Sequence, residues 1–326
     1  MRGQPDVVCV GETMVLLVPD PPRTPDLAAT FRREIGGAES NVAIHLARLG
    51  RRTRWHSILG DDAFGGFVRA RIADEGVDCG TVRHQPKGRT GLYVKELGAD
   101  GTTVAYYRVG SAATSLGAHD LDEVLAGRPR VVHTTGITAV LSDSCASLVE
   151  ALLAEPPSGV LRSFDINYRP GLHGDRSAQR LRELAQRSDI VFCGLDEAQA
   201  LWGAESPADV RDLLKGPDTV VVKQGPDGAT AYRDGQSWHS PAPRVDVVEP
   251  VGAGDAFAAG VLDGILDSAD MPDCLERGAA LAGAALRVDG DLPPHDAGVY
   301  ARFAGGRDHV DADVAKGHER ADVRSR

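Results

Sequence analysis

Four consecutive residues in the last third of the chain combine an anion-binding turn with a carboxylate. Gly252, Ala253, Gly254 and Asp255 follow a strand-like run at residues 245–248 and precede an apolar helical run. Small residues at a helix start leave backbone N–H groups open to an anion, which the helix dipole also favours. An aspartate there can accept the proton of an attacking hydroxyl. The pattern predicts phosphoryl transfer with Asp255 as the base; the simpler alternative is a tight turn in which Asp255 only caps the helix.

A second glycine-containing segment lies near the N-terminus, at residues 35–43. The adjacent Gly36 and Gly37 would let the backbone approach a ligand closely. Asn41 offers a donor and an acceptor for a substrate hydroxyl. A strand-to-helix turn in which a polar side chain caps the helix would use the same residues. Gly36, Gly37 and Asn41 are therefore candidate substrate-binding residues.

A third segment, residues 223–228, is a candidate nucleotide loop. Lys223 follows a strand-like run at residues 219–222, and Gly225 and Gly228 come directly after it. Glycine-rich loops at the carboxyl ends of parallel strands suit nucleotides, although an ordinary β-turn has the same composition. The sequence has neither a G-x-x-x-x-G-K-[ST] P-loop nor a G-x-G-x-x-G fingerprint. A phosphotransferase with this sequence would not be of the P-loop type.

The elements that must position these segments alternate between strand and helix patterns. The strand-like runs are residues 7–10, 54–59, 131–133, 161–166, 190–193 and 219–223. Such alternation predicts an α/β fold, with a mainly parallel sheet between two layers of helices. Two segments depart from this alternation. Residues 12–34 have the pattern of two strands around a proline-rich loop, and residues 90–109 have the pattern of a hairpin that turns at residues 99–101. We predict that they form a small antiparallel sheet, a lid over a cleft.

Composition and charge restrict the class of protein. The chain has 326 residues, 42% of them hydrophobic, and a formal net charge of -11. The acidic balance argues against a nucleic-acid partner, which would need a basic face. No apolar run reaches membrane-spanning length and no signal-peptide pattern is present, so no membrane partner is expected. We predict one domain at residues 1–305 and a poorly ordered, charged tail at residues 306–326.

Cysteine and histidine positions predict no metal cluster. The five cysteines are scattered, odd in number and never spaced as C-x-x-C. This pattern argues against a disulfide framework or a zinc site and favours a reducing, cytoplasmic location. The ten histidines show no metal-ligand spacing, and His133 lies in an apolar strand-like run. We expect His133 to be a buried core residue.

Together these segments resemble the ribokinase-like (PfkB) carbohydrate kinases over residues 6–295. Gly36-Gly37 and Asn41 fall at the spacing of that family's N-terminal motif, and residues 250–262 are similar to its C-terminal motif. The resemblance implies a three-layer α/β/α kinase fold with a β lid and an enzyme that uses ATP and Mg²⁺. It also implies that Asp255 is the catalytic base, that the amides of residues 252–254 form the anion hole, and that the lid can serve as a homo-oligomer surface.

Within the family, the chain looks most like the 2-keto-3-deoxygluconate kinases. The segments that carry this likeness are residues 90–93, 106–113 and 165–170. In such kinases the matching residues that line the sugar-acid site are Tyr93, Tyr106, Arg108 and Arg169. Strand alternation puts Tyr106 and Arg108 on one face, and a guanidinium is a natural partner for a carboxylate. The alternative is that the tyrosines only brace the lid.

Further functional residues complete the predicted site. We predict that Asn167 binds the nucleotide with the loop residues Lys223, Gly225 and Gly228, together with Gly252 and Gly254. Glu197 matches a residue that organises the waters of Mg²⁺. Two departures from the family pattern are Gly194, where an asparagine is frequent, and Glu249-Pro250, where an aspartate and a threonine are usual. In the family the second segment often carries a monovalent-cation site, and with these departures we assign none here.

Four functions stay open at this stage. The leading one is ATP-dependent phosphorylation of the terminal hydroxyl of 2-keto-3-deoxygluconate. The same fold would also serve a neutral-sugar kinase of the fructokinase or ribokinase type, or a 5-dehydro-2-deoxygluconokinase. A non-catalytic protein that binds sugar acids is a fourth reading, against which the presence of Asp255 argues. Arg108 and Arg169 favour an acidic substrate, because a neutral sugar offers them no carboxylate.

Overall fold

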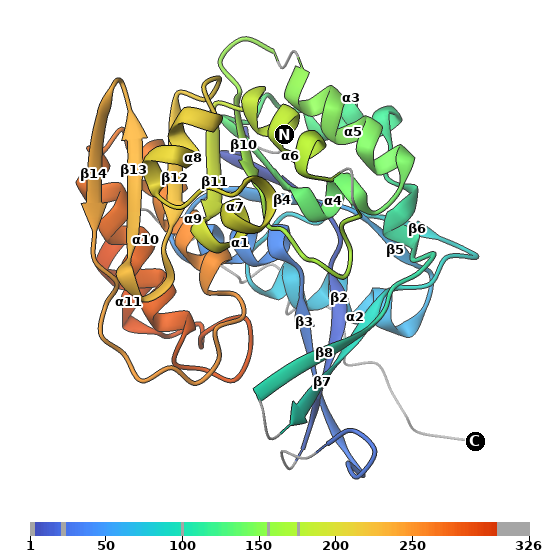
Figure 1. Cartoon of the computed structure of the whole chain (residues 1–326). Helices are drawn as coiled ribbons and strands as arrows, with labels where there is room; N and C mark the ends of the chain where they lie inside the picture. The colour runs from blue at the N-terminus through green and yellow to red at the C-terminus, as the bar shows by residue number, and fades with distance from the viewer. Residues whose placement is uncertain (1–3, 21–23, 99–100, 155–156, 175–176, 305–326) are drawn as a thin grey trace, which may run out of the picture.

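The core of the protein is an eight-stranded sheet between two layers of helices, seen in the computed structural model (Figure 1). The structure describes residues 4–20, 24–98, 101–154, 157–174 and 177–304. The strands of this sheet are, in spatial order, β14 (Gln236–Ser240), β13 (Ala229–Arg233), β12 (Thr219–Lys223), β11 (Ile190–Gly194), β10 (Leu161–Asp165), β9 (Val131–Thr135), β1 (Val7–Val10) and β4 (Thr53–His56). Pairs from β4 to β12 are parallel, and β13 and β14 add an antiparallel edge. The predicted mainly parallel α/β fold is confirmed.

Both faces of the large sheet are covered, which explains its continuously apolar strands. In β1, Val7 and Cys9 pack into one cluster, whereas Val8 and Val10 pack into another on the opposite face. The first cluster includes side chains from α1 (Ala38–Arg48), α2 (Ala63–Asp74), α9 (Ala253–Leu266), α10 (Met271–Ala285) and α11 (Gly298–Phe303). The opposite face is covered by α3 (Leu121–Val124), α4 (Gly136–Val140), α5 (Asp143–Ala154), α6 (Ser177–Gln186), α7 (Leu195–Trp202) and α8 (Pro207–Leu213). A strand that is buried on both faces has no polar side to alternate with.

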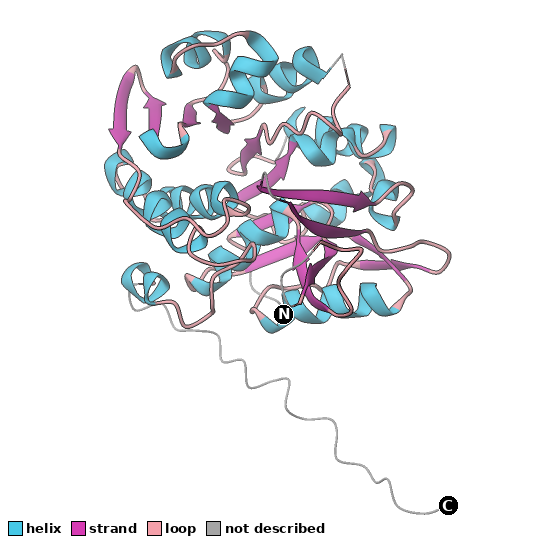
Figure 2. Cartoon of the chain, turned by 60° about the horizontal axis from the view of Figure 1, so that its bottom comes forward, coloured by secondary structure: helices cyan, strands magenta, loops and turns pink. Residues whose placement is uncertain are grey.

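A separate four-stranded sheet stands off the large one (Figures 1 and 2). Its order is β3 (Phe31–Gly36), β2 (Met14–Pro19), β7 (Leu92–Gly98) and β8 (Gly101–Tyr107). The two hairpins, β2 with β3 and β7 with β8, are antiparallel as predicted. The middle pair, β2 with β7, is parallel, because the chain passes through α1, β4 and α2 before it returns to this sheet. We call this four-stranded sheet the lid sheet.

Two predicted strands differ in the structure. The run at residues 54–59 divides into β4 and β5 (Ile58–Gly60), and β5 pairs with β6 (Arg83–Gln85). The run at residues 245–248 was predicted to be a strand, and this was wrong: it has no ladder partner, and Val247 and Val248 are about 60% exposed. β-branched residues form strands only where a sheet edge is available to pair with them, and the edge strand β14 ends at Ser240.

Three further expectations concern the core, the ends and the membrane. His133 is buried in β9, 2.9 Å from the Ser163 hydroxyl through its Nδ1, and burial lowers its pKa to about 4; the prediction of a core histidine is confirmed. The turn residues 99–100 and the tail at residues 306–326 lie outside the described part of the chain. Among the helices that the structure describes, none has the length and apolarity needed to cross a bilayer.

Candidate active site

The predicted base and the N-terminal motif meet where two helices begin. Asp255 lies in the first turn of α9, whose N-cap is Gly252. Asn41, in the second turn of α1, donates a hydrogen bond from Nδ2 to Asp255 Oδ2 at 2.9 Å. The two residues are 214 positions apart in the chain. The structure therefore brings together two motifs that the sequence could only propose separately.

Position 252 requires a glycine for two reasons, its backbone conformation and its close contact with Asp291. Its φ of +81° lies in the left-handed region that glycine adopts most readily. A Cβ atom at this position would overlap the backbone oxygen of Asp291. The turn at residues 252–254 is consequently pressed against the segment that contains Asp291, and it presents the first N–H groups of α9, which have no partner within the helix.

Asp291 is a site residue that sequence reasoning missed. It is 6% exposed, accepts a hydrogen bond from Asn41 Nδ2 at 3.3 Å, and lies 3.3 Å from the Tyr93 hydroxyl. Gly36 allows this contact, because a Cβ there would overlap the Tyr93 hydroxyl and lie 2.8 Å from Asp291 Oδ2. Asp291 follows α10 in an irregular loop without a motif. Only the tertiary fold places it beside Asp255.

The two neighbouring carboxyl groups bind protons more tightly than ordinary aspartates. Burial is the main cause that raises the pKa of Asp255 to about 7; repulsion from Asp165 and Asp291 adds to the rise, while the Asn41 hydrogen bond and Lys223 oppose it. Burial also raises the pKa of Asp291, against the attraction of Lys95. A carboxyl group poised near neutrality is suited to accept a proton from a hydroxyl.

The lid sheet supplies the aromatic side of the site. The rings of Tyr93 and Tyr106 lie 5.7 Å apart, and the Arg108 guanidinium lies 5.8 Å from the Tyr106 ring centre. Through Tyr93 these side chains connect to Asp291, and Asn41 connects Asp291 to Asp255. The structure thus brings together a continuous row from Arg108 to Asp255.

Arg108 has an internal partner that the sequence did not reveal. Its Nη2 donates to Glu12 Oε2, and Ser111 donates from its hydroxyl to the other oxygen of Glu12. Glu12 is 4% exposed, and Gly37 packs against its backbone carbonyl, where a Cβ would lie 2.5 Å away. Arg108 Nε is buried and has no hydrogen-bond partner among the described residues. One donor of the guanidinium is therefore unsatisfied within the described part of the chain, and the side chain as a whole is 12% exposed.

A second charged group lies at the carboxyl ends of β10, β11 and β12. Lys223 Nζ donates to both oxygens of Asp165, at 3.1 and 2.8 Å. Although burial opposes it, attraction by Asp165 and Glu197 raises the pKa of Lys223. A Cβ at Gly254 would lie 3.4 Å from Lys223 Nζ. Lys223 is therefore a permanent positive charge next to the turn at residues 252–254.

The same edge of the sheet carries oxygen ligands suited to a hard cation. Glu197 Oε2 accepts from the Gly194 N–H at 2.9 Å, so the side chain also caps α7. Burial raises the pKa of Glu197, and repulsion from Asp165 acts in the same direction. Asn167 Oδ1 is buried and has no hydrogen-bond partner among the described residues. Carboxylate and amide oxygens of this kind fit Mg²⁺ and its waters.

Two groups of predicted residues lie apart from this row. Gly225 belongs to a short 3-10 turn that joins β12 to the antiparallel β13, and Gly228 has a φ of +99° where a Cβ would overlap the Ser240 carbonyl. Arg169 is exposed and makes local hydrogen bonds, from Nη1 to the Tyr168 carbonyl at 3.4 Å and from its N–H to His173 Nδ1 at 3.1 Å. It attracts Glu197 and lowers the pKa of that carboxyl group, against the larger effect of burial. Arg169 thus lies on the Glu197 side of the site.

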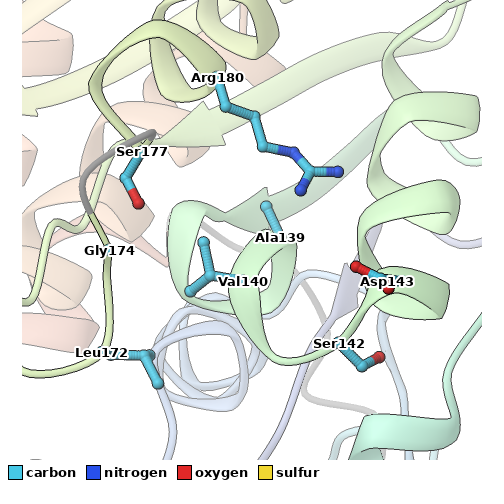
Figure 3. Close-up of a pocket in the computed structure, with 8 residues that line it drawn as sticks. All are labelled: Ala139, Val140, Ser142, Asp143, Leu172, Gly174, Ser177 and Arg180. Carbon is cyan, nitrogen blue, oxygen red and sulfur yellow. The ribbon is translucent and has the colours of Figure 1, made fainter.

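Two surface hollows flank these residues. One, of about 690 Å³, is lined by Tyr106, Arg108 and residues at the start of α2. The other, of about 440 Å³, lies among α4, α5 and α6, and Figure 3 labels the residues that line it. The second hollow contains none of the predicted site residues. We therefore place the candidate ligand on the lid-sheet side.

The fold brings together one group of possible metal ligands that the spacing of histidines in the sequence did not reveal. His56, Asp120 and Glu123 place possible ligand atoms within 4.8 Å of one another, and in the described part of the chain no other such group is found. Asp120 already binds the Arg83 guanidinium and the Gly117 N–H. Because a metal ion would have to compete with this guanidinium, the group reads as part of an ion-pair network.

Comparison with known proteins agrees with this geometry. The sequence pattern described as "pfkB family carbohydrate kinase" matches residues 4–296. A 2-dehydro-3-deoxygluconokinase of Bacillus subtilis is 35% identical over 295 residues, which cover 88% of this chain and 91% of the relative. A 5-dehydro-2-deoxygluconokinase of Clostridium perfringens is 31% identical and covers 85% of this chain and 86% of the relative.

Solved structures agree on the fold. The PfkB protein of Polaromonas sp. JS666 superposes with a TM-score of 0.81 at 34% identity, over 92% of this chain and 99% of its own. A sugar kinase of Pyrococcus horikoshii, solved in complex with ATP, gives a TM-score of 0.79 at 22% identity, over 91% of this chain and 99% of its own. The likeness extends over the large sheet, the helical layers and the lid sheet together.

Proposed function

The chain belongs to the pfkB family of carbohydrate kinases, and from that premise we propose that it transfers the γ-phosphate of ATP to the terminal hydroxyl of 2-keto-3-deoxygluconate. Membership makes it a sugar kinase, which transfers phosphate to a hydroxyl group, and kinases of this family use ATP. Its relatives that act on deoxygluconates support a sugar acid as the class of substrate. The finer choice among sugar acids is our proposal.

The observation that carries the proposal is the free donor of Arg108. Its Nε is buried without a hydrogen-bond partner in the described part of the chain, at the end of the row that begins at Asp255. A sugar acid has a carboxylate at one end and its terminal hydroxyl at the other. A substrate lying along this row would offer the carboxylate to Arg108 and the hydroxyl to Asp255. Tyr93, Tyr106 and Asn41 would contact its middle, and Arg169 would approach from the opposite side.

In this mechanism the side chains hold charge and move one proton. Asp255 accepts the proton of the terminal hydroxyl as the oxygen attacks phosphorus. The N–H groups of residues 252–254 and the neighbouring Lys223 stabilise the negative charge that develops on the transferred phosphoryl group. Asn41 fixes the orientation of the Asp255 carboxylate through their hydrogen bond. Residues 223–228 and Asn167 would contact the nucleotide.

Mg²⁺ fits the proposed site through its oxygen ligands. Glu197 and Asn167 would hold the ion and its waters, since Asn167 Oδ1 lacks a partner within the described residues, whereas Asp165 is already paired with Lys223. When bound, Mg²⁺ would neutralise charge on the β- and γ-phosphates.

The ion pair between Arg108 and Glu12 supports a second candidate function, a neutral-sugar kinase. The charge of Arg108 is already matched by the buried Glu12, which lowers the attraction available to a substrate carboxylate. A neutral ketose such as fructose would meet the same aromatic and hydroxyl-binding groups without needing that charge. A sugar-acid kinase must instead bind its substrate with the remaining donors of Arg108 or with Arg169.

A panel of acceptors tests the proposed function directly. ADP release would be measured with 2-keto-3-deoxygluconate, its C4 epimer, 5-dehydro-2-deoxygluconate, fructose and ribose, each with Mg²⁺ and with a chelator. We expect kcat/KM for 2-keto-3-deoxygluconate to exceed that for fructose by about tenfold or more, because one charge-assisted hydrogen bond is gained. Activity should disappear with the chelator. Preference for fructose would assign the second function, and no ADP release with any acceptor would leave a binding protein.

The raised pKa of Asp255 predicts an unusual pH profile. An ordinary aspartate is ionised above about pH 5, but burial raises the pKa of Asp255 to about 7. Because only the carboxylate accepts a proton, kcat/KM should rise about tenfold per pH unit on the acidic limb and level off above about pH 8. The measurement is kcat/KM for the sugar at saturating ATP and Mg²⁺ between pH 5 and 9. A limb centred below pH 5 would show that Asp255 is not the titrating base.

A further inference from the structure

A buried lysine joins the lid sheet to the segments around the anion-binding turn. Lys95 lies on β7 and is 2% exposed. Its Nζ donates to Glu249 Oε2 at 3.1 Å and to the backbone carbonyl of Asp289 at 2.9 Å. Neither Lys95 nor these contacts belongs to the row from Arg108 to Asp255. A lysine is almost never this buried unless its charge is paired.

The two acceptors of Lys95 belong to different segments that pack on each other. The Val248 N–H donates to the Leu286 carbonyl at 2.8 Å, which holds the start of one segment against the other. Further along, Gly252 packs so closely on Asp291 that a Cβ would overlap its backbone oxygen. Lys95 crosslinks the same two segments between these points. Its ammonium therefore links the two segments that meet at the turn of residues 252–254.

Two other lid-sheet side chains hold the same segment. Tyr93, two residues before Lys95 and on the same face of β7, contacts Asp291. Arg32, on β3, forms an ion pair with the Asp289 carboxylate at 2.9 Å, but both side chains are well exposed. The lid sheet is thus seated on residues 289–291 by an exposed ion pair, a phenol and a buried ammonium. Of these three side chains, only Lys95 also contacts Glu249, three residues before Gly252.

We propose that Lys95 is a positioning residue for phosphoryl transfer: its ammonium couples the seating of the lid sheet to the placement of the anion-binding turn at residues 252–254. The inference rests on the proposed function of that turn. Phosphoryl transfer depends on the placement of N–H donors, and a misplacement of about 1 Å can cost about 100-fold in rate. Any displacement of the lid sheet when a sugar binds would be transmitted through Lys95 to Glu249 and to the Asp289 carbonyl.

If Lys95 only stabilised the fold, its variants would behave differently from those of a positioning residue. A single and a double variant distinguish these two roles. Lys95→Met leaves the Glu249 carboxylate buried without its partner, which destabilises the fold. The double variant Lys95→Met/Glu249→Gln removes both charges and should regain most of the lost melting temperature. If Lys95 serves stability alone, this double variant regains kcat as well. If Lys95 positions the turn, it stays about 10- to 100-fold below wild type in kcat, while KM for ATP changes little.

Arg32→Met is the matched control, because it removes a second lid-sheet contact to the same segment at the surface. Exposed ion pairs contribute little, so its kcat should stay within about twofold of wild type. Rates are divided by the concentration of protein that binds ATP, so that unfolded protein does not count. The acceptor is whichever sugar the wild type phosphorylates best. An inactive wild type would defeat the proposed function, whereas an active wild type with an equally active double variant would defeat only the role of Lys95.

Chemical rescue gives an independent reading. Lys95→Ala opens a space beside Glu249 and the Asp289 carbonyl that ammonium or methylammonium can enter. We expect either cation to raise kcat of Lys95→Ala severalfold at millimolar concentrations, with no effect on wild type or on Arg32→Met. Wild-type kcat in the double variant, or absence of rescue in folded Lys95→Ala, would overturn the proposal. Failure of Lys95→Met/Glu249→Gln and of Lys95→Ala to fold would also overturn it, since Lys95 would then be a structural residue.

Discussion

Replacing Asp255 with asparagine is expected to lower kcat by about 10² or more while folding and ATP binding stay near normal. The asparagine can still accept the hydrogen bond from Asn41, so the geometry at the start of α9 should persist. It cannot take the proton of the attacking hydroxyl. The measurement is steady-state kcat with the best sugar of the panel, combined with ATP binding by calorimetry. Near-normal kcat in Asp255→Asn would remove this residue from the mechanism.

Thermal stability provides the control for Asp255→Asn. The substitution is expected to lower activity but to maintain or raise the melting temperature. The pKa of Asp255 is raised from 3.8 to about 7, mainly by burial. Ionisation therefore disfavours the folded state increasingly as pH rises from about 4 to about 7, and the cost persists above that range. Asp255→Asn lacks this cost. Its melting temperature should equal or exceed that of wild type at pH 8, and the advantage should shrink towards pH 4.

Replacing Arg108 with alanine is expected to lower kcat/KM for 2-keto-3-deoxygluconate by about 10- to 150-fold, because a charge-assisted hydrogen bond contributes about 1.5–3 kcal/mol. Fructose should be affected much less, since it has no carboxylate. The measurement is kcat/KM of wild type and variant on both substrates. Equal losses on the two substrates would mean that Arg108 only braces the lid sheet through Tyr106 and Glu12.

The Glu12 contact calls for a matched variant. Arg108→Ala also leaves the buried Glu12 carboxylate with only Ser111 among its described side-chain partners, and an unpaired buried charge destabilises a protein. Arg108→Ala/Glu12→Gln removes this cost. If the double variant regains stability but keeps the selective loss on the sugar acid, Arg108 contacts the substrate carboxylate. Arg169→Ala, measured beside it, tests whether the second arginine shares that role.

The residues of the local motifs were predictable because each motif depends on a few residues that are adjacent in the sequence. Asp255 follows three small residues at a helix start, and this pattern alone predicts an anion-binding turn with a nearby base. The parallel strands of the large sheet were also predictable, since burial on both faces leaves short runs that are apolar throughout, whereas the half-exposed edge strands β13 and β14 were not predicted. Asn41 and Asp255 were each predicted as site residues, but only the structure shows the hydrogen bond that joins them.

The partners of those residues were not predictable, because each comes from a distant loop or strand without a motif. Asp291 and Glu12 are single acidic residues whose burial, and hence whose effect on Asp255 and Arg108, exists only in the folded chain. Lys95 looks like a solvated lysine on a lid strand, yet it is 2% exposed between two segments about 150 and 190 residues away. The run at residues 245–248 has a strand's composition and no sheet edge to join.

Sequence by itself thus indicated most of the elements, the candidate catalytic motif and the kind of reaction, because these depend on side-chain chemistry over short stretches. Tertiary structure decided which charges are neutralised, which donors stay free and which proton affinities shift. These properties depend on desolvation and on distances between groups that the chain order does not contain. For Arg108, that difference decides whether the guanidinium serves a substrate carboxylate or is fully occupied by Glu12.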